Sequence, residues 1–195
     1  MSEERTSPTV LPTKLVADRV PALARWGLAA AFLLMGVAAL VVVEQTRVWE
    51  ASASAWVLNT MFAVDAEAIP GQPDIFIMGD LPWILRVTME CAVVLIIVPF
   101  LGIAAALAAS GRFRPGRMVL GVVLASVVVI AVNQLRIAVI GWALARAGGD
   151  GYSWWHTIGG SVMTLVGIAG ALLILWVVAI RVPRGRRDRE DGDVA

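Results

Sequence analysis

Three side chains in this sequence stand out because their chemistry is uncommon in an apolar chain. Cys91 is the only cysteine among 195 residues, and His156 is the only histidine. Arg136 is a charge inside an apolar run that continues past it to Leu144, and a charge in such surroundings needs a partner. One cysteine excludes an internal disulfide, and one histidine excludes bis-histidine haem and an ordinary His-rich metal site. We expect no cofactor and no metal.

Together, these three side chains could carry out acyl transfer. A thiol is a nucleophile only as the thiolate, which nearby cations stabilise, and Arg136 and protonated His156 are the cations available to Cys91. The forked donors of an arginine suit an oxyanion that develops on a carbonyl. A histidine can pass a proton to a departing amine. We therefore predict Cys91, Arg136 and His156 as catalytic residues.

Each candidate also has a structural explanation. A free cysteine often serves as a small packing residue, an arginine near a helix end often extends to the lipid headgroups, and a histidine beside tryptophans is typical of an interfacial aromatic belt. Asn133 lies three residues before Arg136, on the same helix face. We predict that it orients the guanidinium or the imidazole, and a hydrogen bond between helices explains it equally well.

The composition indicates an integral membrane protein. Apolar residues make up 59% of the chain, against roughly half in soluble domains, and they occur in blocks. Four blocks are long enough for a membrane-spanning helix, which needs about 20 residues. They are Trp26 to Val43, Cys91 to about Ser110, Met118 to about Ala147, and Thr157 to Ile180. We predict an all-α polytopic protein with four transmembrane helices, in which residues 1–195 form one membrane domain.

The basic residues predict how these helices are oriented, because Lys and Arg concentrate on the cytoplasmic side of a membrane. With four spans, the N-terminal tail 1–25, the connection between the second and third helices, and the C-terminal tail 181–195 fall on one side. These segments carry Arg5, Lys14, Arg19, Arg25, Arg112, Arg114, Arg117, Arg181, Arg184, Arg186, Arg187 and Arg189. We expect both termini in the cytoplasm, the loop 44–90 outside, and the protein in the plasma membrane.

The external loop is predicted to have structure of its own. Trp49 to Val64 has apolar residues at helical spacing and is expected on the membrane surface. Residues 74–90 read as two short strands joined at Gly79-Asp80, and the second strand leads into Cys91. We expect this hairpin to fix the position of the thiol. A glycine-rich turn, Gly148 to Gly151, is expected to join the third and fourth helices.

Distances along the helices place the three candidates at one depth. Each is separated from a cytoplasmic arginine, by 21 residues for Cys91 (Arg112), 19 for Arg136 (Arg117) and 25 for His156 (Arg181). At about 1.5 Å per residue these separations correspond to about 31, 28 and 37 Å of helix. The hydrocarbon core of a bilayer is about 30 Å thick. The three side chains are therefore expected to meet near its outer boundary.

Three sequence elements around these residues form a pattern. A short strand-like stretch, Thr88-Met-Glu-Cys91, ends with the cysteine at the outer start of a helix. Asn133-Gln-Leu-Arg136-Ile137 lies within a later helix, and His156 comes shortly before the last one. Over about residues 44–170, this order resembles the exosortase/archaeosortase family of membrane-embedded cysteine transpeptidases. The resemblance implies that Cys91, Arg136 and His156 are the catalytic set. Two features differ from the family's usual pattern: Cys91 is followed by Ala92-Val93 instead of Ser-Gly, and many members have more helices.

The resemblance implies a function in protein sorting. Family substrates are exported proteins that end in a short motif, a transmembrane helix and a cytoplasmic arginine cluster. An enzyme of this type would cleave the signal at the outer membrane face. Cys91 would attack the scissile carbonyl, Arg136 would hold the oxyanion, and His156 would protonate the departing amine. Its partners would be membrane lipids and such substrates.

Other functions also fit the sequence. Thr157 and Ser161 beside the histidine are compatible with a serine or threonine hydrolase, but no acidic residue is placed to orient His156. A non-enzymatic scaffold or assembly factor needs no catalytic group, and it predicts that Cys91→Ser is silent. Nucleic acid is not an expected partner, because a net charge of +1 gives phosphates no attraction.

Overall fold

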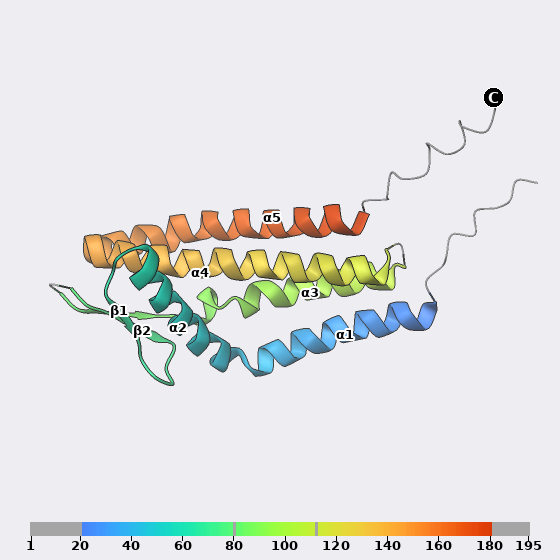
Figure 1. Cartoon of the computed structure of the whole chain (residues 1–195), viewed down its shortest axis with the longest axis horizontal. Coiled ribbons are helices and arrows are strands. Elements are labelled where there is room, and N and C mark those ends of the chain that lie inside the picture. The colour runs from blue at the N-terminus through green and yellow to red at the C-terminus, as the bar shows by residue number, and fades with distance from the viewer. Residues whose placement is uncertain (1–20, 80, 112, 181–195) are drawn as a thin grey trace, which may run out of the picture.

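The computed structural model describes residues 21–79, 81–111 and 113–180, which are mostly helical. The elements follow in the order α1 (Ala22–Val41), α2 (Val43–Met61), β1 (Ala66–Ala68), β2 (Asp74–Ile77), β3 (Trp83–Arg86), a 3₁₀ turn (Met89–Cys91), α3 (Val94–Ala109), α4 (Pro115–Trp154), a π-helical turn (Trp155–Gly159) and α5 (Gly160–Ile180) (Figure 1). The two charged tails, Asp80 and Arg112 lie outside the described residues. Predictions that involve them stay predictions.

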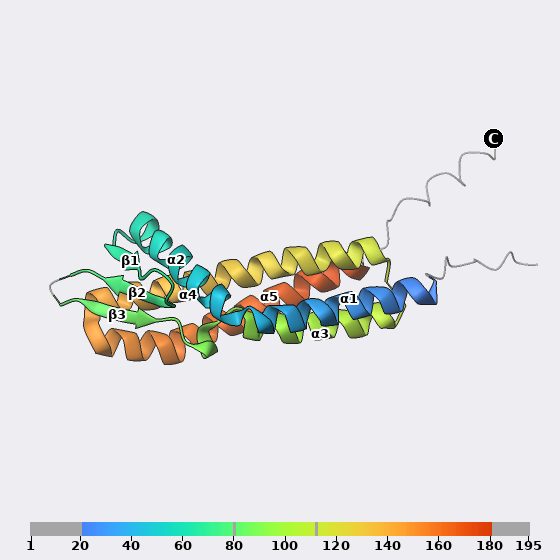
Figure 2. The same cartoon turned by 90° about the horizontal axis from the view of Figure 1, so that it is seen from below.

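A single glycine turns α4 and α5 into a helical hairpin. Gly148 has φ +60° and ψ −145°, and its positive φ is strained for residues with a side chain. The chain turns back there, so that α5 runs beside α4 (Figures 1 and 2). The predicted turn, Gly148 to Gly151, is too long: Gly148 has non-helical dihedrals, whereas the residues after it are helical. The last helical arm accordingly begins before the predicted Thr157, and His156 lies within it.

A second pair of helices, α1 and α3, packs against α4, mainly through α3 (Figure 2). α1 ends at Val41, two residues before the predicted end, because Val42 has non-helical dihedrals and α2 begins at Val43. α3 begins at Val94 and not at Cys91, because Ala92 is extended. Ala22–Val41 and Pro115–Ala179 are long and apolar enough to cross a membrane, and Val94–Ala109 is apolar but shorter. This composition is compatible with a membrane location.

A small antiparallel sheet and α2 pack against the far end of α4. The sheet has the order β1-β2-β3, with Ile75 opposite Leu85 and Ile77 opposite Trp83. The predicted hairpin is therefore confirmed in its two strands. β1 is absent from the predicted pattern because Ala66-Glu-Ala68 is short and has a low preference for strands. The predicted surface helix is also helical, and one of its faces packs on α4 and the sheet. Its location on the membrane surface stays a prediction.

Two clusters of buried apolar side chains divide the molecule along α4. The four-helix cluster contains residues of α1, α3, α4 and α5, among them Phe32, Leu101, Met118, Val129 and Leu175. The cap cluster contains residues of α2, the sheet and α4, among them Leu58, Ile75, Cys91, Ile137 and Leu144. Asn133 and Arg136 lie between Val129 and Leu144 on α4. They therefore occupy the junction of the two clusters.

Close packing of α4 on α5 depends on Gly167. A Cβ at this position would lie 2.8 Å from Val132 Cγ1. We expect Gly167→Ala to lower the free energy of unfolding by about 1–3 kcal/mol through overpacking, as measured by denaturant unfolding of the purified protein in detergent. Gly170→Ala is the matched control, because a Cβ there meets nothing within 4 Å. Equal destabilisation by both variants would contradict this explanation.

Candidate active site

Cys91 is the last residue of the 3₁₀ turn that connects the sheet to α3. β3 ends at Arg86, so the predicted strand does not lead directly into Cys91; Val87 and Thr88 separate it from the 3₁₀ turn. Cys91 is 5% exposed and belongs to the cap cluster. The thiol is thus held inside the protein, at the point where the chain passes from the sheet to α3.

Three long-range hydrogen bonds hold the backbone around Cys91. They run from Arg47 Nε to Val87 O (2.8 Å), from Val93 N to Glu50 Oε1 (3.0 Å), and from Asn133 Nδ2 to Cys91 O (2.9 Å). We call Arg47, Glu50 and Asn133 the Cys91 clamp. Buried backbone groups outside helices and strands need such partners. The clamp supplies these hydrogen-bond partners from α2, which precedes the Cys91 segment in the chain, and from α4, which follows it.

Asn133 is the central member of this clamp. It is 2% exposed, and its Nδ2 donates both to Cys91 O and to Glu50 Oε1, the latter at 2.7 Å. Neither the guanidinium of Arg136 nor the imidazole of His156 is among these hydrogen-bond partners, so the predicted orienting role of Asn133 stays a prediction. The alternative explanation, a hydrogen bond between helices, is correct and takes the form of a bond between α4 and α2. Asn133 Oδ1 has no hydrogen-bond partner among the described residues.

Arg136 lies one turn beyond Asn133 and is 8% exposed. Its guanidinium packs against α5, where a Cβ on Gly160 would come within 2.7 Å of Arg136 Nε. Among the described residues, Nε has no hydrogen-bond partner and no carboxylate forms an ion pair with the side chain. A buried, uncompensated charge is unfavourable. The site is therefore chemically suited to a negative charge beside Arg136.

His156 lies in the π-helical turn between α4 and α5 and is half-buried. Its ring stacks on Tyr152, with centroids 5.1 Å apart and planes inclined by 12°. Tyr152 and Trp155 pack against the cap cluster, which contains Cys91. Turns of π-helix occur frequently at functional sites. The stacking fixes the plane of the imidazole next to this cluster.

The structure thus gathers the predicted residues in one region without joining their reactive atoms. Asn133 connects the backbone of Cys91 to α4, Arg136 follows on α4, and Gly160 brings Arg136 against the helix that carries His156. Within the described ranges, no hydrogen bond links the thiol to the guanidinium or to the imidazole. The catalytic set therefore stays a prediction that this arrangement supports.

Glu50 is the site residue that sequence analysis misses. It is 4% exposed, and its Oε2 has no partner within the described part of the chain. Burial raises the pKa of its carboxyl, against the lowering effects of the hydrogen bonds from Val93 and Asn133 and of the charge on Arg47. A sequence pattern that could have indicated Glu50 is a polar stripe at helical spacing, formed by Glu44, Arg47, Glu50 and Ser54. It lies on the helix face opposite the exposed Trp49 and Trp56.

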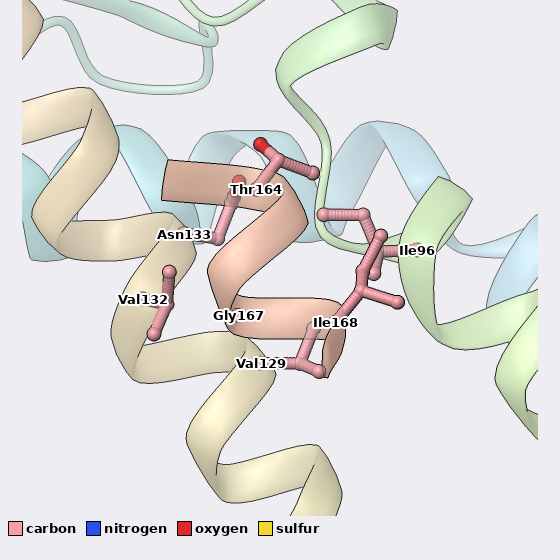
Figure 3. Close-up of a pocket in the computed structure, with 7 residues that line it drawn as sticks. All are labelled: Ile96, Val129, Val132, Asn133, Thr164, Gly167 and Ile168. Carbon is pink, nitrogen blue, oxygen red and sulfur yellow. The ribbon is translucent and has the colours of Figure 1, made fainter. Parts of the chain in front are cut away.

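A hollow beside Asn133 opens between three helices (Figure 3). It is narrow, opens in part to the outside, and is lined by Ile96, Val129, Val132, Asn133, Thr164, Gly167 and Ile168. The Thr164 hydroxyl donates to Gly160 O, so the lining is otherwise apolar except for Asn133. The hollow exists because α3 and α5 both approach α4 but hardly touch each other.

The chain matches no protein-family model, no curated protein and no solved structure. The resemblance to the exosortase/archaeosortase family therefore rests on the sequence pattern. Among the described residues, no three His, Cys, Asp or Glu side chains gather in a way that could hold a metal ion. The features that bear on function are the Cys91 thiol, the Arg136 guanidinium, the His156 imidazole and the side chains that contact them.

The buried Glu50 carboxyl predicts a pH dependence of stability. Because burial raises its pKa above the ordinary value of 4.5, the folded state binds this proton more tightly than the unfolded state. The contribution to stability is complete below the unfolded pKa and is lost as the pH rises through the folded pKa. Unfolding in detergent from about pH 4 to about pH 8 should show this loss in the wild type and less of it in Glu50→Gln. Identical pH profiles of stability in the wild type and in Glu50→Gln would contradict the assignment of this pH dependence to Glu50.

Proposed function

We propose that this protein is a membrane-embedded cysteine peptidase or transpeptidase that cleaves the C-terminal sorting signals of exported proteins. The observation that carries the proposal is the hydrogen bond from Asn133 to Cys91 O, because it ties the nucleophile to the helix turn that precedes Arg136. The contact of Arg136 with Gly160, one turn after His156, supports a shared site. The resemblance to the exosortase/archaeosortase family supplies the substrate class.

In the proposed mechanism, the Cys91 thiolate attacks the carbonyl carbon of the scissile peptide bond. The carbonyl electrons move to oxygen, and Arg136 stabilises the resulting negative charge. The carbon–nitrogen bond then breaks, and protonated His156 gives its proton to the departing amine. An acceptor amine or water attacks the thioester, which releases the thiolate and returns a proton to His156. Nucleophile and proton therefore return to their starting state.

We further propose four membrane spans with both termini in the cytoplasm and the active site on the outer face. Gly148 lies 33 residues after Pro115, so the first arm of the hairpin is about 50 Å long. This exceeds the hydrocarbon thickness of about 30 Å, so about 20 Å of the arm remain for packing with α2 and the sheet. Asn133 lies 18 residues after Pro115, about 27 Å along the helix, close to the outer boundary.

The topology predicts which side of the membrane two exposed positions face. In a Cys91→Ala background, a cysteine introduced as Gln72→Cys lies in the cap, and one introduced as Arg114→Cys lies at the other end of the bundle. A membrane-impermeant maleimide should label Gln72→Cys in intact cells. Arg114→Cys should react only after the membrane is permeabilised. Labelling of both positions in intact cells would contradict four spans.

The mechanism predicts the effect of the reactive groups on processing. A co-expressed exported protein that ends in a motif, a transmembrane helix and an arginine cluster should be shortened by the wild type. Cys91→Ser should reduce the rate by about 10³-fold or more, and Arg136→Lys by about 10²-fold because the fork of donors is lost. Ser161→Ala is the control, since its hydroxyl donates to Thr157 O. Loss of processing in Ser161→Ala alone would favour a serine hydrolase.

One observation favours the alternative of a non-enzymatic scaffold. Cys91 is 5% exposed, and a nucleophile has to reach its substrate. An electrophile derived from the sorting signal separates the two functions. An enzyme forms a covalent adduct at Cys91, detectable by mass spectrometry, whereas a scaffold forms none and keeps its function in Cys91→Ser.

A further inference from the structure

The inner face of α2 carries three buried polar side chains, Arg47, Glu50 and Ser54, beside the apolar residues that pack into the cap cluster. Arg47 and Glu50 bond to the backbone around Cys91, and Ser54 donates to Gln134 Oε1 at 2.7 Å. Glu44 accepts both hydrogen bonds from the terminal nitrogen of Arg47. These contacts orient α2 toward α4 and toward the segment that contains Cys91. α2 is therefore part of the candidate site and not only an external cover.

Glu50 is the point at which these contacts converge. Its Oε1 accepts the N–H of Val93, at the start of α3, and the N–H of Asn133 Nδ2, on α4. The same Nδ2 group donates to Cys91 O. One carboxylate oxygen therefore fixes the backbone two residues after Cys91 and also the amide that holds Cys91 itself.

A buried carboxyl at this position is a weak way to gain stability. Replacement of a whole buried ion pair by apolar side chains of similar volume is often neutral or stabilising, so a buried charged group is weak evidence for a stabilising role. Directional hydrogen bonds to Val93 and Asn133 nevertheless determine the path of the backbone, which apolar packing does not do. Glu50 is therefore suited to setting geometry more than to adding stability.

We propose that Glu50 is a positioning residue for Cys91, which keeps the thiol buried and correctly oriented by holding Val93 and Asn133. Without the Glu50 acceptor, the N–H of Val93 is free and Asn133 loses one of its two partners. The segment Cys91–Val93 can then move away from α4. The consequence for catalysis rests on the proposed function, but the consequence for the thiol does not.

The test uses the alkylation rate of Cys91 in the full-length protein in native membranes. Cys91 is the only cysteine, so N-ethylmaleimide reports on this thiol alone. Glu50→Leu should raise the rate by about tenfold or more, because both buried hydrogen bonds to Glu50 Oε1 are lost. Glu50→Gln, which keeps a side-chain oxygen that accepts both bonds, should restore the rate to within about twofold.

Glu67→Leu is the matched control, because this carboxylate is exposed on β1. A wild-type rate in Glu50→Leu, a rate in Glu50→Gln as high as in Glu50→Leu, or an equal increase in Glu67→Leu would overturn the proposal. If Glu50→Leu does not fold, Asn133→Leu removes the same link from α4 and should also accelerate alkylation. An unchanged alkylation rate in Asn133→Leu would also overturn the proposal.

Processing of the sorting signal separates this inference from the proposed function. If the wild type processes its substrate, Glu50→Leu should lower kcat more than it changes KM, and Glu50→Gln should restore kcat. If alkylation changes as expected but the wild type processes nothing, Glu50 positions a thiol that is not a peptidase nucleophile, and only the proposed function fails. If processing occurs but alkylation does not respond to Glu50, only the positioning role fails.

Discussion

A polar junction at the level of Asn133 determines how the two halves of this protein are aligned. The four-helix cluster and the cap cluster both pack on α4, and apolar packing has no direction of its own. The bonds from Asn133 to Glu50 Oε1 and to Cys91 O do have direction. They fix α2 and the Cys91 segment at one position along α4. A shift of one helical turn would leave these polar groups buried without partners, which is strongly unfavourable.

The same junction depends on a close approach of α4 and α5. Gly148 allows the chain to reverse within one residue, and Gly160 and Gly167 lie so near Arg136 and Val132 that a Cβ would collide with them. Small residues let two backbones approach where larger ones would separate them. The reversal and the small residues together bring the helix with His156 against Arg136. The glycines of the hairpin therefore act on the site through helix spacing, without contacting Cys91.

The parts of the structure that follow from local sequence are the ones the sequence predicts. Blocks of apolar residues indicate the helices, alternation around Gly79 indicates β2 and β3, and Gly148 marks the reversal. Helix ends differ where the backbone leaves helical dihedrals, as at Ala92, which is extended, so that α3 begins at Val94. β1 and the role of Glu50 are not predictable in this way. Both depend on partners elsewhere in the chain: β1 pairs with β2, where Ile77 lies opposite Ala66, and Glu50 accepts the N–H of Val93.

Buried polar atoms around Cys91 bear on the choice between the proposed enzyme and a scaffold. Buried side-chain polar atoms are nearly always hydrogen-bonded, yet four in the described region around Cys91 are not: Glu50 Oε2, Thr88 Oγ1, Asn133 Oδ1 and Arg136 Nε. A scaffold gains nothing from such groups, which reduce its stability. A peptide bond offers the matching chemistry, an acceptor for Arg136 and a donor for the oxygens. Of the four groups, only the Arg136 guanidinium and the Thr88 hydroxyl can donate a hydrogen bond, and in the proposed mechanism Arg136 would stabilise the negative charge that develops on the scissile carbonyl.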